Sequence, residues 1–477
     1  MNKFYITGAI PYVNAEPHIG HALEFVQTDT IARYHRLLGE EVLVLSGGDE
    51  NALKNVQAAE QANAPIQEFV DQNTQRFYEL TKKLNAQFDI WQKGSDKKRH
   101  YPSSQKLWEL CKKNGDIYKK QYTGLYCVGC ETFYSPGELN EKGECFEHPG
   151  QKLERVTEEN YFFKLSKYQN RLVEIVQKGE YKIVPETRKN EVLSFLESGL
   201  EDISISRSNE RAKNWGVPVP GDSTQRIYVW FDALNIYQSG VGFGWDEGKY
   251  NKWWPADVHA IGKGILRFHA VYWPAFLLSA GLKLPKSLFV HGYFTVDGQK
   301  MSKTLGNVVD PFRLVDEYGA EALRYYFLAK FAPFSDGDFS EEKLKDIYNA
   351  DLANNLGNLV SRVAKLAETD EFDFSSTKIE FKDRVFKDYH GWFKEFRFNE
   401  ACASVWNKID AANRFIDDNR PWEKKGRDLG VILNHLVAEI REIAFLLKPF
   451  LPETAEKIEK QFKGPNIKSA EPLFPRI

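Results

Sequence analysis

Apolar and polar positions follow two different periods along the first part of the chain. Residues 4–7 and 42–46 are short apolar runs, as buried strands have. Between them, apolar side chains approximate a helical stripe at Leu23, Val26, Ile31, Tyr34 and Leu38. A strand–helix–strand order implies a parallel sheet, with its ligand site at the carboxyl ends of the strands.

The strand pattern is interrupted and then returns. Strand-like runs resume at 226–231, 258–261 and 287–291, after a cysteine-containing turn region and mixed elements. From about residue 346 the pattern is helical, with apolar residues at threes and fours until Pro449 and Pro452. We therefore predict an α/β protein in five parts: the first half of a sheet domain (1–115), an insertion (116–215), the second half (216–305), a linker (306–345) and a helical domain (346–477).

Composition narrows the class of protein. No apolar run approaches the roughly 18 residues of a membrane helix, and the first strand begins too early to leave room for a targeting peptide. The net charge of −3 argues against wholesale binding of nucleic acid but allows a local basic face. Five cysteines, most of them clustered, do not make a secreted disulfide framework. We expect a cytoplasmic protein with no membrane contact.

The first candidate for chemistry is His18-Ile19-Gly20-His21, which follows the first strand and opens the predicted helix. A helix N-terminus offers N–H groups and the positive end of a dipole, and so suits anions. His18 and His21 share a helix face, and Gly20 lets a ligand approach the backbone. The motif predicts a phosphate site, with ordinary surface histidines as the alternative.

The second candidate is Lys300-Met301-Ser302-Lys303, which follows a turn signal at residues 296–299. Two ammonium groups three residues apart suit the neutralisation of a transferring phosphate. A solvated charged loop is the alternative. The order and separation of the two motifs favour one shared function.

A third pattern predicts a metal site. Cys127 and Cys130 are separated by two residues, as are Cys145 and His148. Three thiolates and one imidazole at this spacing complete a tetrahedral zinc site and leave no open position, so the zinc would be structural. Iron or cobalt also fits these ligands, and free thiols near a histidine are the alternative.

The two phosphate motifs resemble the HIGH and KMSKS signatures of class I aminoacyl-tRNA synthetases. Further motifs are similar to the methionyl-tRNA synthetase branch, over about residues 3–450: 9–14, 228–234 with Tyr237, 262–263, 267–269, 273–275 and 289–293. The resemblance implies a Rossmann-type doubly wound parallel sheet, an inserted zinc-knuckle connective domain and a C-terminal all-α anticodon-binding bundle.

The resemblance also implies the roles of individual residues. A methionine pocket should be apolar and aromatic, because the thioether is only a weak acceptor. Asp49 would bind the substrate ammonium, and Arg207 matches an arginine near the active site. The pocket would comprise Ile10, Tyr12, Asp49, Trp230, Leu234, Tyr237 and His269. ATP would be bound by His18, Gly20, His21, Lys300, Met301, Ser302 and Lys303, with His18, His21, Lys300 and Lys303 as the catalytic residues.

The implied reaction joins L-methionine to ATP, accompanied by Mg²⁺, and passes methionine from AMP to the terminal adenosine of tRNA(Met). The anticodon-binding residues by motif match are Asn358, Arg362, Pro421 and Trp422. For Trp422, capping of a helix corner is the alternative. The chain stops at Ile477, before the C-terminal dimerising barrel of some relatives, so we expect a monomer.

The chain departs from the family pattern at three places. Asn51 and Ala52 stand where a histidine and a glycine usually follow the acidic pair, Gly264 stands where an aspartate is common, and Thr304 replaces a serine. Two alternatives therefore stay open. One is a class I synthetase for cysteine, leucine, valine or isoleucine. The other is a tRNA-binding relative whose catalytic core has decayed.

Overall fold

The computed structural model describes residues 2–127, 132–134, 139–145, 150–301, 306–369, 372–377 and 383–477. The chain forms two compact units. Unit 1 consists of Met1–Pro17, Glu41–Thr81 and Gln87–His291, and unit 2 of His18–Glu40, Lys82–Ala86 and Gly292–Ile477. The first predicted helix therefore belongs to unit 2, although the strands before and after it belong to unit 1.

Unit 1 is built on a six-stranded sheet in the order β3-β2-β1-β12-β13-β7, and all five strand pairs are parallel. From β1, the strand order runs through β2 and β3 on one side and β12 and β13 on the other. Open sheets bind ligands at such a reversal, beyond the carboxyl ends of the strands. The strands are β1 (Lys3–Gly8), β2 (Glu41–Gly48), β3 (Ile90–Lys93), β7 (Lys182–Val184), β12 (Val258–Gly262) and β13 (Ser287–His291).

The prediction of an α/β protein with a parallel sheet is confirmed, but two details differ. The run 226–231 is not one strand: β11 (Asp222–Ile227) ends there and helix α7 (Val229–Leu234) begins. All six residues of α7 are buried, and periodicity cannot distinguish a short helix that is buried all round from a buried strand. Strand β7 lies inside the range expected as an insertion, yet it pairs with β13 at the sheet edge.

Antiparallel strands form the rest of the β structure of unit 1. The longest pair is β4 with β6, from Ile117 opposite Phe163 to Tyr126 opposite Glu154. One sheet has the order β5-β4-β6-β8 and the other β10-β11-β9. The bounds are β4 (Ile117–Cys127), β5 (Thr132–Tyr134), β6 (Glu154–Phe163), β8 (Ile203–Ser204), β9 (Ser206–Ser208) and β10 (Pro218–Val219).

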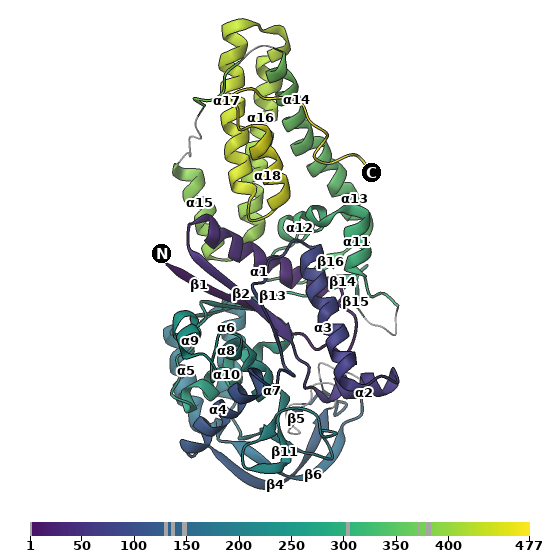
Figure 1. Ribbon diagram of the computed structural model, residues 1–477, viewed down its shortest axis with the longest axis vertical. Helices are drawn as coiled ribbons and strands as arrows, with labels where there is room; N and C mark the ends of the chain where they lie inside the picture. The colour runs from purple at the N-terminus through teal and green to yellow at the C-terminus, as the bar shows by residue number, and fades with distance from the viewer. Residues whose placement is uncertain are drawn as a thin grey trace. The chain divides into compact units, whose positions relative to one another are not determined.

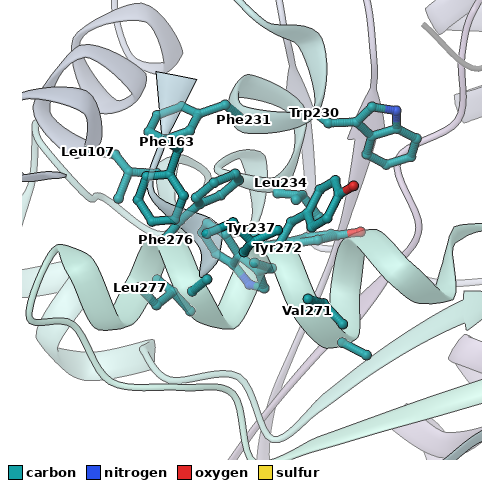
Figure 2. Close-up of a cluster of buried hydrophobic side chains, with 14 of the residues drawn as sticks. Leu107, Phe163, Trp230, Phe231, Leu234, Tyr237, Val271, Tyr272, Phe276 and Leu277 are labelled. Atoms are coloured by element: carbon teal, nitrogen blue, oxygen red, sulfur yellow. The ribbon is translucent and has the colours of Figure 1, made fainter. Parts of the chain in front are cut away.

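Helices and large aromatic side chains make the core of unit 1. Trp108, Trp273 and Tyr181 are fully buried, and Figure 2 shows Phe163 and Phe276 packed together, in edge contact at 4.9 Å between ring centroids. The helices are α2 (Leu53–Gln61), α3 (Ile66–Lys83), α4 (His100–Lys113), α5 (Gln169–Lys178), α6 (Glu186–Glu197), α8 (Ile236–Ser239), α9 (Glu247–Trp253) and α10 (Trp273–Ser279), with η2 (Leu165–Tyr168), η3 (Lys263–Ile265) and the π-turn η4 (Phe268–Tyr272).

Unit 2 is mainly helical, which confirms the prediction of a helical C-terminal region. Figure 1 shows four of its helices running alongside one another: α14, α16, α17 and α18. Helix α17 ends at Leu447, before Pro449, as predicted. No described helix has the length and apolar character of a membrane span. The elements are α1 (Ile19–Leu37), α11 (Pro311–Tyr318), α12 (Ala320–Ala329), α13 (Glu341–Ile347), η5 (Tyr348–Gly357), α14 (Asn358–Glu368), α15 (Asp383–Lys394), α16 (Phe398–Asn419), η6 (Pro421–Glu423), α17 (Gly426–Leu447), α18 (Pro452–Gln461), β14 (Phe294–Val296), β15 (Gln299–Lys300) and β16 (Gly337–Phe339).

A fully buried ion pair joins α1 to the rest of unit 2. Arg324 of α12 donates to the carboxylate of Asp29 of α1 over 2.7 Å, and both side chains are inaccessible to solvent. Arg33 binds the same carboxylate oxygen over 2.6 Å. Arg324 also donates to the carbonyls of Pro449 and Phe450, between α17 and α18. One guanidinium thus fixes the helix that begins after His18 to a corner of the C-terminal helices.

Candidate active site

The carboxyl ends of β1 and β2 position the first two residues of the predicted pocket. Tyr12 and Asp49 form an isolated parallel bridge just beyond the two strands. The Asp49 N–H donates to the carbonyl of Pro11 over 2.9 Å, and the Asp49 side chain is buried. A carboxylate is therefore held at the sheet edge where a parallel sheet binds its ligand.

Aromatic rings of α7 and η4 form the wall of this pocket. Trp230 meets the Tyr12 ring edge-on, with centroids 6.1 Å apart, and lies flat on Phe268 at 3.7 Å. Leu234 follows Trp230 by one helical turn and is buried (Figure 2). Ile10 packs against the same core from beyond β1. These rings and aliphatic groups suit an apolar, polarisable side chain.

The polar part of the pocket is a hydrogen-bonded pair. The Tyr237 hydroxyl lies 2.8 Å from Nε2 of His269, while Nδ1 of His269 lies 2.9 Å from the carbonyl of Ile265. Because a carbonyl only accepts, Nδ1 carries the proton and Nε2 accepts from Tyr237. Burial lowers the pKa of His269 to about 4. His269 is therefore neutral at physiological pH.

Sequence reasoning missed three neighbours of this pocket. Phe268 stacks on Trp230, but it lies in a π-turn, whose period differs from the helical repeat. The His259 ring lies tilted against that of Tyr237, with centroids 4.4 Å apart. Burial, and to a lesser extent the nearby His269, lowers the pKa of His259 well below its usual range. Lys54 places its ammonium 3.1 Å from the centroid of the Tyr12 ring. Only Phe268 had a sequence signal, because it precedes His269 within a matched motif.

Asn51, at the position where the family usually has a histidine, has a structural role. Its amide donates to the carbonyl of Gly94 over 2.8 Å and to a carboxylate oxygen of Asp232 over 2.6 Å. The other Asp232 oxygen accepts from His100 over 2.8 Å and from Ser104 over 2.7 Å. The side chain of Asn51 thus fastens the end of β2 to α7, the helix that carries Trp230.

Arg207 lies in β9, among aromatic rings of unit 1. Its guanidinium carbon is 4.4 Å from the ring centroid of Tyr228 and 5.0 Å from that of Phe133. It donates to the Ser204 hydroxyl and to the Ser206 carbonyl. The side chain is buried, 7% exposed, so its charge is offset by ring faces and hydrogen bonds rather than by water.

The first phosphate motif caps α1 in unit 2. Nδ1 of His18 accepts from the N–H of Gly20 over 3.1 Å, and Nδ1 of His21 accepts from the N–H of His18 over 3.1 Å. The imidazoles stack at 3.9 Å, and burial and the neighbouring His18 lower the pKa of His21 well below its usual value. With both Nδ1 atoms accepting, each neutral ring carries its proton on Nε2, which is a donor suited to a phosphate oxygen.

The second motif lies beside the first within unit 2. Asp297 and Gly298, both with positive φ, form the turn between β14 and β15, as a two-residue hairpin requires. Lys300 ends β15, where it pairs with Thr295. Met301 reaches Gly20: a Cβ at that glycine would lie 3.8 Å from Cε of Met301 and only 3.0 Å from the His18 ring. Ser302 and Lys303 are outside the described residues.

Two of the four predicted metal ligands can be placed. Cys127 ends β4 and Cys145 follows a turn in which the Asn140 side chain accepts from two backbone N–H groups. Both thiols are buried. Cys130 and His148 lie outside the described residues, and the part of the chain that the structure describes holds no cluster of three metal-binding side chains.

The predicted anticodon residues gather at one corner of unit 2. Arg362 of α14 pairs with Asp417 of α16 over 2.8 Å, and its guanidinium carbon is 5.9 Å from the Trp422 ring centroid. Pro421 is buried, whereas Trp422 is 55% exposed. Asn358 is exposed one turn before Arg362 on the same helix. The Trp422 ring is therefore accessible beside a cation, as a base-stacking ring must be.

A parallel sheet with a pocket at its strand ends, and a separate pair of phosphate motifs, define the class of protein as a class I tRNA synthetase. The family model described as tRNA synthetases class I (M) matches residues 4–364.

Named relatives identify the branch of this class. The methionine–tRNA ligase of Thermotoga maritima is 40% identical over all of this chain and 80% of its own length. That of Nostoc sp. is 40% identical, over 96% of this chain and 89% of its own. Mycobacterium tuberculosis methionyl-tRNA synthetase in complex with methionyl-adenylate covers both chains fully at 35% identity, with a TM-score of 0.90. The chain therefore belongs to the methionyl-tRNA synthetase family, which confirms the resemblance.

Proposed function

We propose that this protein activates L-methionine with ATP, giving methionyl-adenylate and pyrophosphate, and then transfers methionine to the 3′-terminal adenosine of tRNA(Met). The observation that carries the proposal is the pocket of Tyr12, Trp230 and Leu234, with the neutral Tyr237–His269 pair at its polar end. Such a site fits a thioether, because the side-chain pocket offers ring faces and a neutral hydrogen-bonded pair as its polar end. Each ring–sulfur contact contributes roughly 0.3–1.5 kcal/mol.

Positioning is the main contribution of unit 1 to the first step. Asp49 would bind the substrate ammonium, which fixes the direction of the methionine carboxylate. The reaction is attack of that carboxylate on the α-phosphorus of ATP with departure of pyrophosphate. No covalent enzyme intermediate is needed, so holding the reactants in line and stabilising charge account for catalysis.

The phosphate motifs of unit 2 would stabilise the charge that develops on ATP. His18 and His21, protonated on Nε2, would donate to phosphate oxygens without becoming cationic. Lys300 and Lys303 would supply positive charge, and Met301 and Gly20 would shape the backbone beside the triphosphate. A magnesium ion bound with the triphosphate would add further positive charge.

The exposed corner at Trp422, with Asn358, Arg362 and Pro421, would read the anticodon loop, since unpaired bases stack on accessible rings. The zinc would be structural, held by Cys127, Cys130, Cys145 and His148. The buried thiols of Cys127 and Cys145 are consistent with that role, since structural zinc sites are closed to solvent. A cytoplasmic monomer stays our prediction.

ATP–pyrophosphate exchange with each of the twenty amino acids, without tRNA, tests this function. Exchange with methionine alone is expected. Exchange with cysteine, leucine, valine or isoleucine instead would support a class I synthetase but refute the assignment of the pocket to methionine. No exchange with any amino acid, despite binding of tRNA, would establish a decayed catalytic core.

The metal proposal has a separate test. The purified protein should contain about one zinc per chain, as a four-ligand structural site does. Cys127→Ser should lower the zinc content and the thermal stability, whereas Cys402→Ser, which changes a buried thiol outside the motif, should leave the zinc content unchanged. Equal zinc contents in the two variants would refute the assigned ligands.

A further inference from the structure

A second cavity lies in unit 1, beside the methionine pocket. Its volume is about 310 Å³, at the lower end of the range of ligand pockets. Aromatic rings form much of its lining: Tyr122, Phe133, Phe162, Phe195, Tyr228 and Tyr272. Rings on several sides of a small cavity favour a flat ligand that stacks.

The polar groups of the cavity are of two kinds. Arg207, buried against Tyr228, presents a planar cation. Glu201 and Asp202 contribute carboxylates. Asp202 is held by the Tyr118 hydroxyl over 2.9 Å and by the Ser166 hydroxyl over 2.6 Å, while Glu201 is exposed. Carboxylate oxygens accept hydrogen bonds, so the cavity suits a flat group that carries N–H donors.

Two further cations lie on rings that line the cavity. The Arg267 guanidinium carbon is 4.2 Å from the centroid of Phe195, and the Lys120 ammonium is 5.6 Å from that of Phe162. Neither side chain lines the cavity itself. A ligand with a flat base inside and phosphates outside would therefore match the arrangement, and single-stranded RNA has this composition.

A series of ring contacts connects this cavity with the methionine pocket. Tyr272 of the cavity meets Phe268 edge-on at 5.4 Å, and Phe268 lies flat on Trp230 at 3.7 Å. A base in the cavity is thus separated from the methionine site by a few side chains. That spacing suits nucleotides adjoining the one that reacts.

We propose that this cavity binds one of the two cytosines that precede the terminal adenosine of tRNA, while the adenosine receives methionine. Glu201 and Asp202 accept from the exocyclic amine of the cytosine, the aromatic rings and Arg207 cover its faces, and Arg267 and Lys120 neutralise the flanking phosphates. The proposal rests on the proposed function, and it concerns only the transfer step.

Two rates measured on the full-length enzyme test the proposal: ATP–pyrophosphate exchange, and single-turnover transfer from preformed methionyl-adenylate to tRNA. Phe195→Ala should slow transfer about tenfold or more, as loss of a base-stacking ring does, and leave exchange unchanged. Phe195→Tyr should restore transfer. The matched control is Trp253→Ala, a partly buried ring of unit 1 with a cation beside it that does not line the cavity.

Base identity provides a second readout. Replacing one of the two cytosines by uracil exchanges the amine for a carbonyl and should slow transfer by wild-type enzyme about tenfold, the loss of one good hydrogen bond to a charged group. Glu201→Gln offers an amide donor and should reduce that penalty.

Each contrary outcome has a distinct meaning. Unchanged transfer in Phe195→Ala, or no penalty for uracil at either position, would show that the cavity holds no base. Equal losses in exchange and transfer would show that the cavity only supports the methionine pocket. Wild-type enzyme that fails to exchange methionine would refute the proposed function, and the transfer proposal with it.

Discussion

Trp422→Ala separates tRNA selection from methionine activation. The ring is 55% exposed in η6, and Arg362 lies 5.9 Å from its centroid. A base stacked on an aromatic side chain is worth roughly 1–3 kcal/mol. Since 1.4 kcal/mol is a factor of ten, kcat/KM for tRNA should fall by about 5- to 150-fold.

The same change should leave two other quantities almost untouched. Substitutions of exposed residues usually change the free energy of unfolding by less than about 0.5 kcal/mol, so the melting temperature should equal that of the wild type. The methionine pocket is built from other residues, so the rate of pyrophosphate exchange should also be unchanged. Aminoacylation is measured over a range of tRNA concentrations, and exchange in parallel without tRNA.

The matched control is Val431→Ala, an apolar side chain of the neighbouring helix α17 that is 65% exposed. It removes exposed apolar surface without removing a ring. Parallel losses in exchange and aminoacylation for Trp422→Ala would contradict the anticodon role. A loss of the same size for Val431→Ala would show that the ring itself is not what the tRNA recognises.

Three further changes test the site and its support. Buried His269 has a pKa of about 4 in the folded protein, whereas in the unfolded chain it binds a proton below about pH 6.5. The free energy of unfolding therefore decreases by about 3 kcal/mol as the pH falls from about 6.5 to about 4. His269→Gln should flatten this part of the curve of melting temperature against pH, and an unchanged curve would refute the assignment. Arg324→Met removes a buried cation that pairs with the Asp29 carboxylate. It should lower the free energy of opening of α1 and α12, measured by hydrogen exchange, by about 3–5 kcal/mol. A loss below about 1 kcal/mol would show that Arg33 alone neutralises the carboxylate. Gly20→Ala puts a Cβ 3.0 Å from the His18 ring and should depress exchange well below the level of Ala22→Gly, a buried control on the same helix; equal activities would show that the cap tolerates the methyl group.

Strand positions could be predicted where the apolar run was isolated between turn signals. The predicted run 287–291 coincides with β13, and 258–261 differs from β12 by one residue. The run 226–231 was wrong because Trp230 and its neighbours are buried on all sides, and no periodicity marks such a segment. Motifs in the sequence predicted the roles of the site residues, but they did not predict which side chains contact those residues. His259 and Lys54 reach the pocket from other elements, so no local pattern could place them there.

The sequence by itself determined the class of sheet, the family, the two phosphate motifs and the spacing of the candidate metal ligands, because each is a local pattern in the chain. The tertiary structure alone decided the ionisation of His269, which follows from burial, and the use of Asn51 as a bridge from β2 to α7. It also decided that Met301 lies by Gly20 and that Arg207 lies among rings. These properties depend on groups that are distant along the chain, and only folding brings such groups within hydrogen-bonding or van der Waals distance.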